Sequence, residues 1–258
     1  MATQKVIALT EYPLPLSTIS SNIIAAKPMA KKEEVRGMFN RIAHRYDYLN
    51  HFLSLGIDKR WRKRLRKDLQ KHHPASILDV ATGTADLAIE LTKLKPETII
   101  GVDIAEAMLA VGDKKIARKK LQHIIRLQPA DSENLPFGEH TFDAATVSYG
   151  VRNFETPLKG LKEIHRTLKP GGVLMVLEFG MPDRFPVKQG YSFYFNFILP
   201  LWGRVFSGSY DSYKYLPESV KSFPYDQDFV SLLKDAGFKE ARATKLTMGI
   251  TYLYEAVK

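Results

Sequence analysis

Apolar residues follow two different spacings along the chain. Before about residue 71 they recur every three or four positions, which predicts helices. The first helix is expected from Lys31 onward, and its apolar face consists of Val35, Met38, Phe39 and Ile42. The second is expected to run from its N-cap, Asp58, to Lys71. Its apolar stripe consists of Trp61, Leu65 and Leu69.

From residue 76 onward, short apolar runs of strand length alternate with helical stretches. The expected strands are Ser76–Val80, Thr98–Asp103, Ile124–Ala130, Phe142–Ser148, Gly172–Phe179, Ala241–Thr247 and Ile250–Val257. The expected helices are Ala85–Lys95, Ala105–Arg118, Pro157–Leu168 and Asp226–Ala236. Strands that alternate with helices form a parallel sheet covered on both faces, and such buried strands lack polar alternation. The sequence therefore predicts an α/β fold with a mostly parallel seven-stranded sheet and helices on both faces.

One domain accounts for most of the chain. We expect it to span residues 33–258, with N-terminal helices and an insertion rich in Tyr and Phe at about residues 181–225. Residues 1–32 are expected to be a flexible N-terminal tail, because Glu11, Pro13 and Pro15 interrupt the place where a signal peptide has its apolar core. The sequence contains no run of about 18 uncharged apolar residues, so we expect no transmembrane helix.

Charge and cysteine content narrow the class of protein. The 38 basic residues exceed the 28 acidic residues, which gives a formal charge of +10 and favours an anionic partner. Nucleic acid, a membrane surface and a phosphorylated ligand all fit that description. The chain has no cysteine, which excludes disulfides, thiolate metal sites and a cysteine nucleophile. A reducing compartment suits such a chain, so we expect a cytoplasmic location.

The loop after the first expected strand contains Gly83 between two carboxylates, Asp79 and Asp86. It is not a dinucleotide-binding fingerprint, because Ala81 and Asp86 stand where the other two glycines of G-x-G-x-x-G would be. The carboxylates would repel a pyrophosphate but favour a ligand with positive charge. S-adenosylmethionine carries a sulfonium and an ammonium group, so Asp79 and Gly83 are candidates for binding it.

Polar residues also end the next strands. Asp103, 20 residues after Gly83, can accept both ribose hydroxyls of an adenosine, or instead cap the following helix. Asp131 and Ser132 can accept from an adenine amino group, or simply solvate their loop. Ser148 can face the ligand, or satisfy backbone groups. Because the carboxyl ends of parallel strands meet at one edge of a sheet, these residues together predict an adenosine-binding site.

Several sequence segments, taken in their order along the chain, resemble one enzyme family. They are Phe39–Asp47, Leu53–Ile57 with Trp61, Leu78–Thr84 with Asp86-Leu87, Asp103-Ile104 with Met108-Leu109, Leu135–Phe137, Ser148–Asn153, Leu168–Gly172, Leu177–Phe179 and Asp211–Leu216. Over residues 33–258 the chain is similar to class I S-adenosylmethionine-dependent methyltransferases, and more closely to the ubiquinone/menaquinone biosynthesis C-methyltransferases. The resemblance implies a Rossmann-like fold and S-adenosylmethionine as cofactor. It implies cofactor binding by Thr84, Asp103, Asp131 with Ser132, and Ser148.

The reaction of that family adds a methyl group to a ring carbon of a polyprenylated quinol. The carbon becomes nucleophilic once a ring hydroxyl is deprotonated. By resemblance, we expect Arg152 to stabilise the phenolate, Asn153 to hold a quinol oxygen or a water, and Tyr46 to position the proton. The alternatives are an ion pair for Arg152, a helix cap at Asn153 and a core position for Tyr46. His44 and Asp47 are alternative bases, and no metal is required.

The acceptor is expected to be demethylmenaquinol. The alternative is the 2-polyprenyl-6-methoxy-benzoquinol intermediate of ubiquinone biosynthesis, or both quinols. A nucleic-acid methyltransferase would suit the basic charge, but Ser148–Asn153 stands where amino-directed enzymes of that class have an Asn/Asp-Pro-Pro-Tyr loop. No nucleic-acid partner is therefore expected. A non-enzymatic lipid- or quinone-binding module, and a methyltransferase for another small phenol or sterol, are further alternatives.

Two features favour peripheral contact with an anionic membrane surface. The expected helix has a basic face at residues 60–67, and residues 191–206 are aromatic but too interrupted to span a bilayer. Alternatively, the basic helix face is an ordinary solvated surface, and residues 191–206 are an amphipathic cover over the active site. The sequence leaves open whether the chain forms a homo-oligomer.

Overall fold

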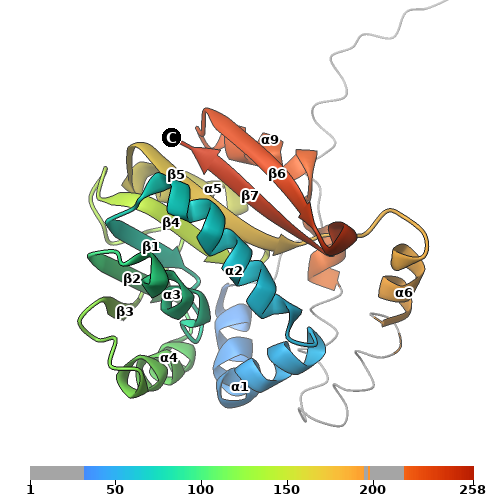
Figure 1. Ribbon diagram of the computed structural model, residues 1–258, viewed down its shortest axis with the longest axis horizontal. Coiled ribbons are helices and arrows are strands. Elements are labelled where there is room, and N and C mark those ends of the chain that lie inside the picture. The colour runs from blue at the N-terminus through green and yellow to red at the C-terminus, as the bar shows by residue number, and fades with distance from the viewer. Residues whose placement is uncertain (1–31, 195–196, 198–217) are drawn as a thin grey trace, which may run out of the picture.

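The computed structural model describes residues 32–194, 197 and 218–258. Its centre is a seven-stranded sheet in the order β3-β2-β1-β4-β5-β7-β6 (Figure 1). The strands are β1 (Ser76–Val80), β2 (Thr98–Asp103), β3 (Ile125–Pro129), β4 (Phe142–Ser148), β5 (Leu168–Phe179), β6 (Glu240–Leu246) and β7 (Thr251–Val257). The first five strands pair in parallel, whereas β7 is antiparallel to both β5 and β6. The prediction of a mostly parallel seven-stranded sheet is confirmed.

The antiparallel strand follows from a short connection. Only the 3-10 turn η5 (Thr247–Gly249) joins β6 to β7. A parallel crossover needs a dozen or more residues, so β7 can only return alongside β6 in the opposite direction. Trp61 on helix α2 donates from Nε1 to Thr247 Oγ1 at 2.9 Å and ties this turn to the rest of the fold.

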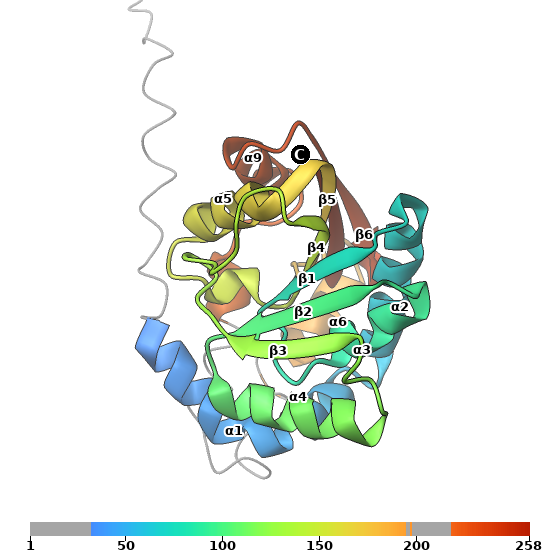
Figure 2. The same ribbon diagram turned by 90° about the vertical axis from the view of Figure 1, so that its left-hand side faces the viewer.

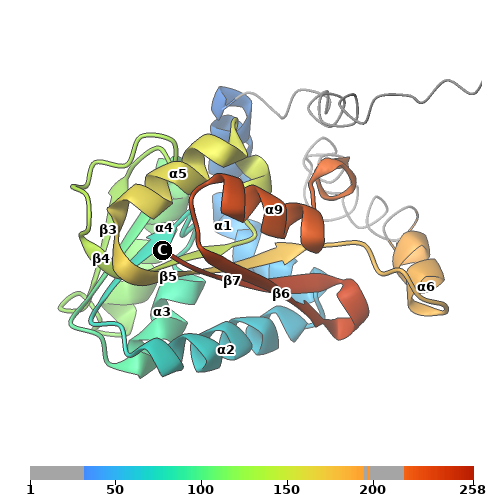
Figure 3. The same ribbon diagram turned by 90° about the horizontal axis from the view of Figure 1, so that it is seen from above.

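Helices cover both faces of the sheet (Figure 3). On one face lie α2 (Ile57–Leu69), α3 (Asp86–Leu91) and α4 (Glu106–Arg118), and on the other lie α5 (Pro157–Thr167) and α9 (Gln227–Asp235). The long helix α1 (Lys32–Leu53) packs on α4 and lies beside the carboxyl ends of β2 and β3 (Figure 2). Helix α6 (Val187–Phe193) stands at the edge of the molecule. The short 3-10 turns are η1 (Gln70–His72), η2 (Thr92–Leu94) and η3 (Val151–Asn153).

Two apolar layers hold the helices to the sheet. Along β1, Ile77 packs into the layer beneath α2 and α3, whereas Leu78 and Val80 pack into the layer beneath α5 and α9. This is the alternation that a strand imposes on neighbouring side chains. Because helices pack on both sides of the sheet, both faces of β1 are buried. Its sequence therefore reads as an apolar run without polar alternation.

Several details differ from the sequence-based expectations. The strand expected over Gly172–Phe179 begins earlier, because β5 starts at Leu168. Asp58 is not the N-cap of α2. The helix begins at Ile57 after Gly56, and Asp58 is buried in the first turn, where Ser54 donates to it at 2.7 Å. The helix expected over residues 85–95 is shorter, because α3 gives way to η2. Helix α1 begins at Lys32, which the expected tail had included.

Other expectations concern segments that the structure describes only in part. Residues 1–31 and the Asp211–Leu216 segment lie outside the described residues. Of the aromatic insertion at about residues 181–225, α6 is described, and its Tyr191 is buried. No helix among the described residues is both long enough and apolar enough to cross a membrane.

Candidate active site

An open cavity lies at the carboxyl ends of the central strands. The ends of β1, β2 and β4 form its floor, with Gly83, Asp103 and Ser148 among the lining residues. Helix α1 contributes Phe39 and Tyr46 to the opposite wall. In open α/β sheets, ligands bind at this edge, so the cavity is where the sequence placed its adenosine site.

The loop after β1 is tightly folded against neighbouring strands. Gly83 has φ 56°, a left-handed conformation that glycine adopts without steric cost, and its N–H donates to Asp103 Oδ2 at 2.8 Å. A Cβ on Gly150 would lie 2.5 Å from the Cβ of Ala81, so the loops after β1 and β4 touch. A glycine at position 150 is the only residue type that permits this close approach.

Asp103 is the last residue of β2 and lies at the cavity. Its carboxylate lines the cavity, and it also accepts the N–H groups of Gly83 and Ala105 at 2.8 Å each. Burial raises the pKa of Asp103, and these two hydrogen bonds oppose that shift. Each carboxylate oxygen has a second lone pair, so Asp103 can still accept hydrogen bonds from a ligand in the cavity.

Asp79 and Thr84, which the sequence analysis expects at the cofactor, are not among the described residues that line the cavity. Asp79 is fully buried beneath the loop and accepts from Thr82 Oγ1 at 2.7 Å and Thr146 Oγ1 at 2.6 Å. Burial raises its pKa to about 6. Thr84 is also buried, and its hydroxyl donates to Asp47. Both residues shape the loop that carries Gly83 rather than the surface of the cavity.

Asp131, Ser132 and Ser148 all line the cavity. The Asp131 carboxylate accepts the Glu133 N–H at 3.0 Å, and Lys32 Nζ lies 2.5 Å from its Oδ2. Burial by itself would raise the pKa of Asp131, but the Lys32 ammonium and the Glu133 N–H lower it below its ordinary value. The first residue of α1 is therefore anchored at the mouth of the cavity, on the carboxylate expected to bind adenine.

The three candidate catalytic residues are not equally placed. Tyr46 and Asn153 line the cavity, and Arg152 does not. Arg152 NH1 lies 2.6 Å from Glu178 Oε1 and donates to the Tyr149 carbonyl at 2.6 Å, while the guanidinium lies over the Phe179 ring. The ion pair that the sequence gave as the alternative for Arg152 is what the structure contains.

Glu178 is a functional candidate that the sequence reasoning missed. It is completely buried at the end of β5, in a run of otherwise apolar residues. A lone charge in such a run is a usable signal, because a buried carboxylate requires a cationic or hydrogen-bonding partner. The alternative bases are less well placed, since neither His44 nor Asp47 lines the cavity, and His44 is exposed.

The lining of the cavity is acidic. Its carboxylates are Asp103, Asp131, Glu133 and Glu155. Among the described lining residues, Lys32 is the cation that faces them. Such a wall favours a positively charged ligand and disfavours a pyrophosphate, and a carboxylate at the end of β2 suits ribose hydroxyls. The donor and acceptor groups of the cavity therefore fit S-adenosylmethionine.

A family model identifies the chain. The model of the ubiE/COQ5 methyltransferase family matches residues 27–258. The chain belongs to the ubiE/COQ5 methyltransferase family. This confirms the resemblance found in the sequence, and the enzyme is an S-adenosylmethionine-dependent methyltransferase.

Curated relatives cover almost the same region as the ubiE/COQ5 model. A demethylmenaquinone methyltransferase of Bacteroides fragilis is 43% identical over 229 residues, which are 88% of this chain and 94% of the relative. A protein of Geobacter sulfurreducens, named ubiquinone/menaquinone biosynthesis C-methyltransferase UbiE, is 41% identical over 230 residues. That alignment covers 88% of this chain and 90% of the relative.

Solved structures share the fold of this ubiE/COQ5 methyltransferase at low sequence identity. A methyltransferase of Thermotoga maritima, described as a possible histamine N-methyltransferase, has a TM-score of 0.57 at 18% identity and covers 87% of this chain and 99% of its own. A SAM-dependent methyltransferase of Aquifex aeolicus has a TM-score of 0.54 at 17% identity, with 74% and 88% covered. These similarities support the Rossmann-like methyltransferase fold.

Proposed function

We propose that the enzyme transfers the methyl group of S-adenosylmethionine to a ring carbon of a polyprenylated quinol, with demethylmenaquinol as the acceptor. The names of the relatives from Bacteroides fragilis and Porphyromonas gingivalis support this acceptor. The name of the Geobacter sulfurreducens relative supports a second candidate, the benzoquinol intermediate of ubiquinone biosynthesis. The proposal rests on one observation: the adenosine-side residues and Tyr46 and Asn153 line the same cavity.

The donor side of the cavity is built from strand ends. We assign the ribose hydroxyls to Asp103 and the adenine amino group to Asp131 with Ser132. Gly83 and Ser148 complete this part of the lining. When bound, S-adenosylmethionine supplies an electrophilic methyl group on a positively charged sulfur. The acidic lining favours the binding of that charge.

Tyr46 and Asn153 form the acceptor side. Burial raises the pKa of Tyr46, and a hydrogen bond with Asn50 and the charge of Arg152 oppose the shift. Tyr46 therefore keeps its proton at neutral pH and acts as a hydrogen-bond donor to the acceptor oxygen or to a water. Arg152 lies behind the wall, where its ion pair with Glu178 holds the turn η3 that carries Asn153. Holding the ring carbon in line with the methyl group supplies on the order of 7–11 kcal/mol of the barrier reduction.

The experiment is methyl transfer from labelled S-adenosylmethionine to three acceptors. They are reduced demethylmenaquinone, a reduced ubiquinone precursor that lacks the ring methyl group, and bulk tRNA. Label in the naphthoquinol supports the proposal, label in both quinols makes the enzyme dual, and label in tRNA alone contradicts it. We expect Tyr46→Phe and Asn153→Ala to lower kcat with little change in cofactor affinity. Asp103→Asn should weaken cofactor binding, whereas the distant Asp143→Asn should leave it unchanged.

We also propose that the enzyme contacts an anionic membrane surface from the cytoplasmic side. The exposed large apolar side chains of the described residues come from the C-terminal part of α1 with its connection to α2, the region around α6 and the turn η5. They are Tyr48, Leu55, Phe185, Phe193, Phe197 and Met248. Figures 1 and 3 place these three segments toward the same end of the molecule. A gathering of exposed apolar residues with basic neighbours is typical of a lipid-facing surface.

The basic face of α2 is divided between two roles. Arg62 and Arg66 are mostly buried in ion pairs with Asp86 and Glu90, at 3.3 Å and 2.9 Å. They are therefore not available to a membrane. Exposed basic residues remain at the start of the helix, next to the exposed Leu55. They are Lys59, Arg60 and Lys63.

Co-sedimentation with vesicles tests this contact. We expect binding to vesicles that contain phosphatidylglycerol at low salt, and a loss of binding as salt rises. The triple change of Lys59, Arg60 and Lys63 to Gln should weaken binding, as should Leu55→Ser with Met248→Ser. The matched control changes three exposed basic residues at the C-terminal end of α4, Lys114, Arg118 and the C-cap residue Lys119, to Gln. Absence of binding at low salt, or an equal loss in the control, contradicts the proposal.

A further inference from the structure

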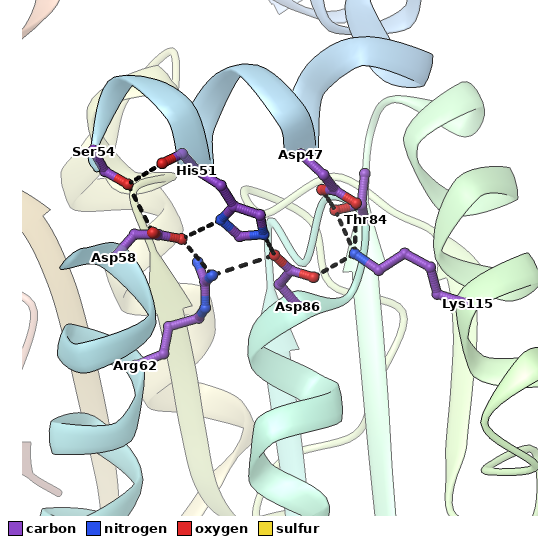
Figure 4. Close-up of polar contacts among 8 residues, drawn as sticks. All are labelled: Asp47, His51, Ser54, Asp58, Arg62, Thr84, Asp86 and Lys115. Carbon is purple, nitrogen blue, oxygen red and sulfur yellow. Dashed lines mark hydrogen bonds and ion pairs between the residues drawn. The ribbon is translucent and has the colours of Figure 1, made fainter. Parts of the chain in front are cut away.

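A chain of ion pairs joins the end of α1 to three other helices (Figure 4). Its centre is Lys115 on α4. The ammonium Nζ lies 2.8 Å from Asp47 Oδ2 on α1, contacts Asp86 at the start of α3, and donates to Thr84 Oγ1 at 3.2 Å. Thr84 in turn donates to Asp47. We call these four residues, Asp47, Thr84, Asp86 and Lys115, the α1 clamp.

The clamp continues into the connection between α1 and α2. Asp86 lies 3.3 Å from Arg62 NH2 and 3.4 Å from His51 Nε2. Both of these groups also face Asp58, at 2.5 Å from Arg62 NH2 and 2.7 Å from His51 Nδ1. Three carboxylates thus alternate with basic side chains, as Figure 4 shows. Because every carboxylate has a basic partner, the chain tolerates its partial burial.

The clamp touches both sides of the cavity through neighbours in sequence. Asp47 follows Tyr46, and Thr84 follows Gly83. Tyr46 and Gly83 line the cavity, whereas no member of the clamp does. Asp47 and Tyr46 are consecutive residues of α1, so the contacts of Asp47 with Lys115 and Thr84 hold the backbone beside Tyr46. Gly83 has an independent anchor, because its N–H donates to Asp103.

We infer that Lys115 and Asp47 are positioning residues that hold Tyr46 on α1 at a fixed place relative to the cofactor loop. This inference rests on the proposed function, in which Tyr46 serves the acceptor side of methyl transfer. Alignment of reacting groups is sensitive to small displacements, and a misplacement of about 1 Å can cost roughly 100-fold in rate. A cation that bridges α1 and α3 next to the loop is suited to prevent such a displacement.

The decisive variant is Lys115→Met, which removes the cation that lies between Asp47 and Asp86. Their repulsion should move α1 away from the loop, so we expect kcat to fall roughly 100-fold. The cofactor Kd should rise less than about threefold, because Asp103 still holds Gly83. The double variant Lys115→Met/Asp47→Asn removes one of the two repelling charges and should recover about tenfold of the lost kcat. Lys115→Arg should retain more activity than Lys115→Met.

A matched control separates positioning from general stability. Arg66→Met breaks another mostly buried helix–helix ion pair, with Glu90, that does not reach the cavity. We expect it to lower the melting temperature without lowering kcat per folded molecule. The inference is overturned if Lys115→Met behaves like Arg66→Met, or if Lys115→Met/Asp47→Asn recovers no activity. The unaltered enzyme is assayed with the quinols before any variant. If it methylates no quinol, the proposed function fails, and the inference about Lys115 is not the cause.

Discussion

Arg152 and Glu178 form a buried ion pair directly behind the cavity. The guanidinium NH1 lies 2.6 Å from Glu178 Oε1, and the Arg152 N–H also points to this carboxylate, at 3.3 Å. Glu178 ends the buried run of β5, and Arg152 lies in the turn η3 after β4. Since β4 and β5 are adjacent and parallel, their carboxyl ends bring the two charges together. The pair fixes the turn η3. Asn153, which follows Arg152 in this turn, lines the cavity.

Removing one partner of this pair should strongly destabilise the fold. Glu178→Gln leaves the Arg152 charge buried, with a neutral amide in place of its carboxylate. We expect a loss of about 3–5 kcal/mol in the free energy of unfolding, measured by urea denaturation. The double variant Arg152→Met/Glu178→Leu should be more stable than Glu178→Gln, because it buries no unpaired charge. A loss below about 1 kcal/mol for Glu178→Gln would contradict the buried pairing.

The Lys32–Asp131 pair should compete with the adenine end of the cofactor. Both groups are partly exposed, so the pair is weak, and its removal should change affinity only modestly. We expect Lys32→Ala to lower the Kd for S-adenosylmethionine by about two- to fivefold, as measured by calorimetry. Asp131→Asn should raise the Kd. Lys169→Ala, which breaks the partly exposed pair with Asp143, is the control. Weaker cofactor binding by Lys32→Ala would show that Lys32 assists binding rather than competing with it.

Asp79 should make the fold less stable as pH rises through the weakly acidic range. Burial raises its pKa from 3.8 to about 6, so the native state holds this proton to a higher pH than the unfolded chain does. The stabilisation is complete below about pH 4 and is lost by about pH 6, with a size of about 3 kcal/mol. Asp79→Asn should therefore flatten the stability profile between pH 4 and pH 7.

Asp143 offers a control of opposite sign for that experiment. Burial would raise the pKa of Asp143, but its bonds with Lys169 and Ser76 lower it to about 2. Its stabilisation is present above about pH 4 and is lost as pH falls toward 2. Asp143→Asn should flatten only this more acidic part of the profile. Identical profiles for both variants would contradict the assignment to Asp79.

Gly150→Ala should separate the loops that form the floor of the cavity. Its new Cβ would lie 2.5 Å from the Cβ of Ala81, so one loop must move. Overpacking of this kind costs about 1–3 kcal/mol in stability. We expect a lower melting temperature and weaker cofactor binding. Gly138→Ala is the matched control, because the nearest atom to its Cβ is at 3.7 Å. Normal cofactor affinity in Gly150→Ala would show that the contact with Ala81 is not needed for binding.

Much of the architecture was predictable from local patterns. The alternation of apolar runs with helical stretches predicts the parallel sheet, because a strand buried on both faces must be apolar throughout. The β6–β7 hairpin is likewise local, since only the four residues 247–250 separate its strands. Strand ends also predicted Asp103, Asp131 and Ser148 as cavity residues, because the carboxyl ends of parallel strands meet at one edge.

The direction and the partner of each polar side chain were decided by the tertiary structure. Asp79 and Asp103 both lie within the last two residues of their strands. Asp79 nevertheless turns beneath its loop toward Thr82 and Thr146, while Asp103 lines the cavity. Lys115 and Asp47 are 68 residues apart and meet only because α1 packs on α4. The sequence by itself determined the family, the order of the elements and the edge of the sheet where the site lies. The fold alone decided which charges pair. Ion pairing depends on the distance between two side chains in space, and the number of residues between them along the chain does not give that distance.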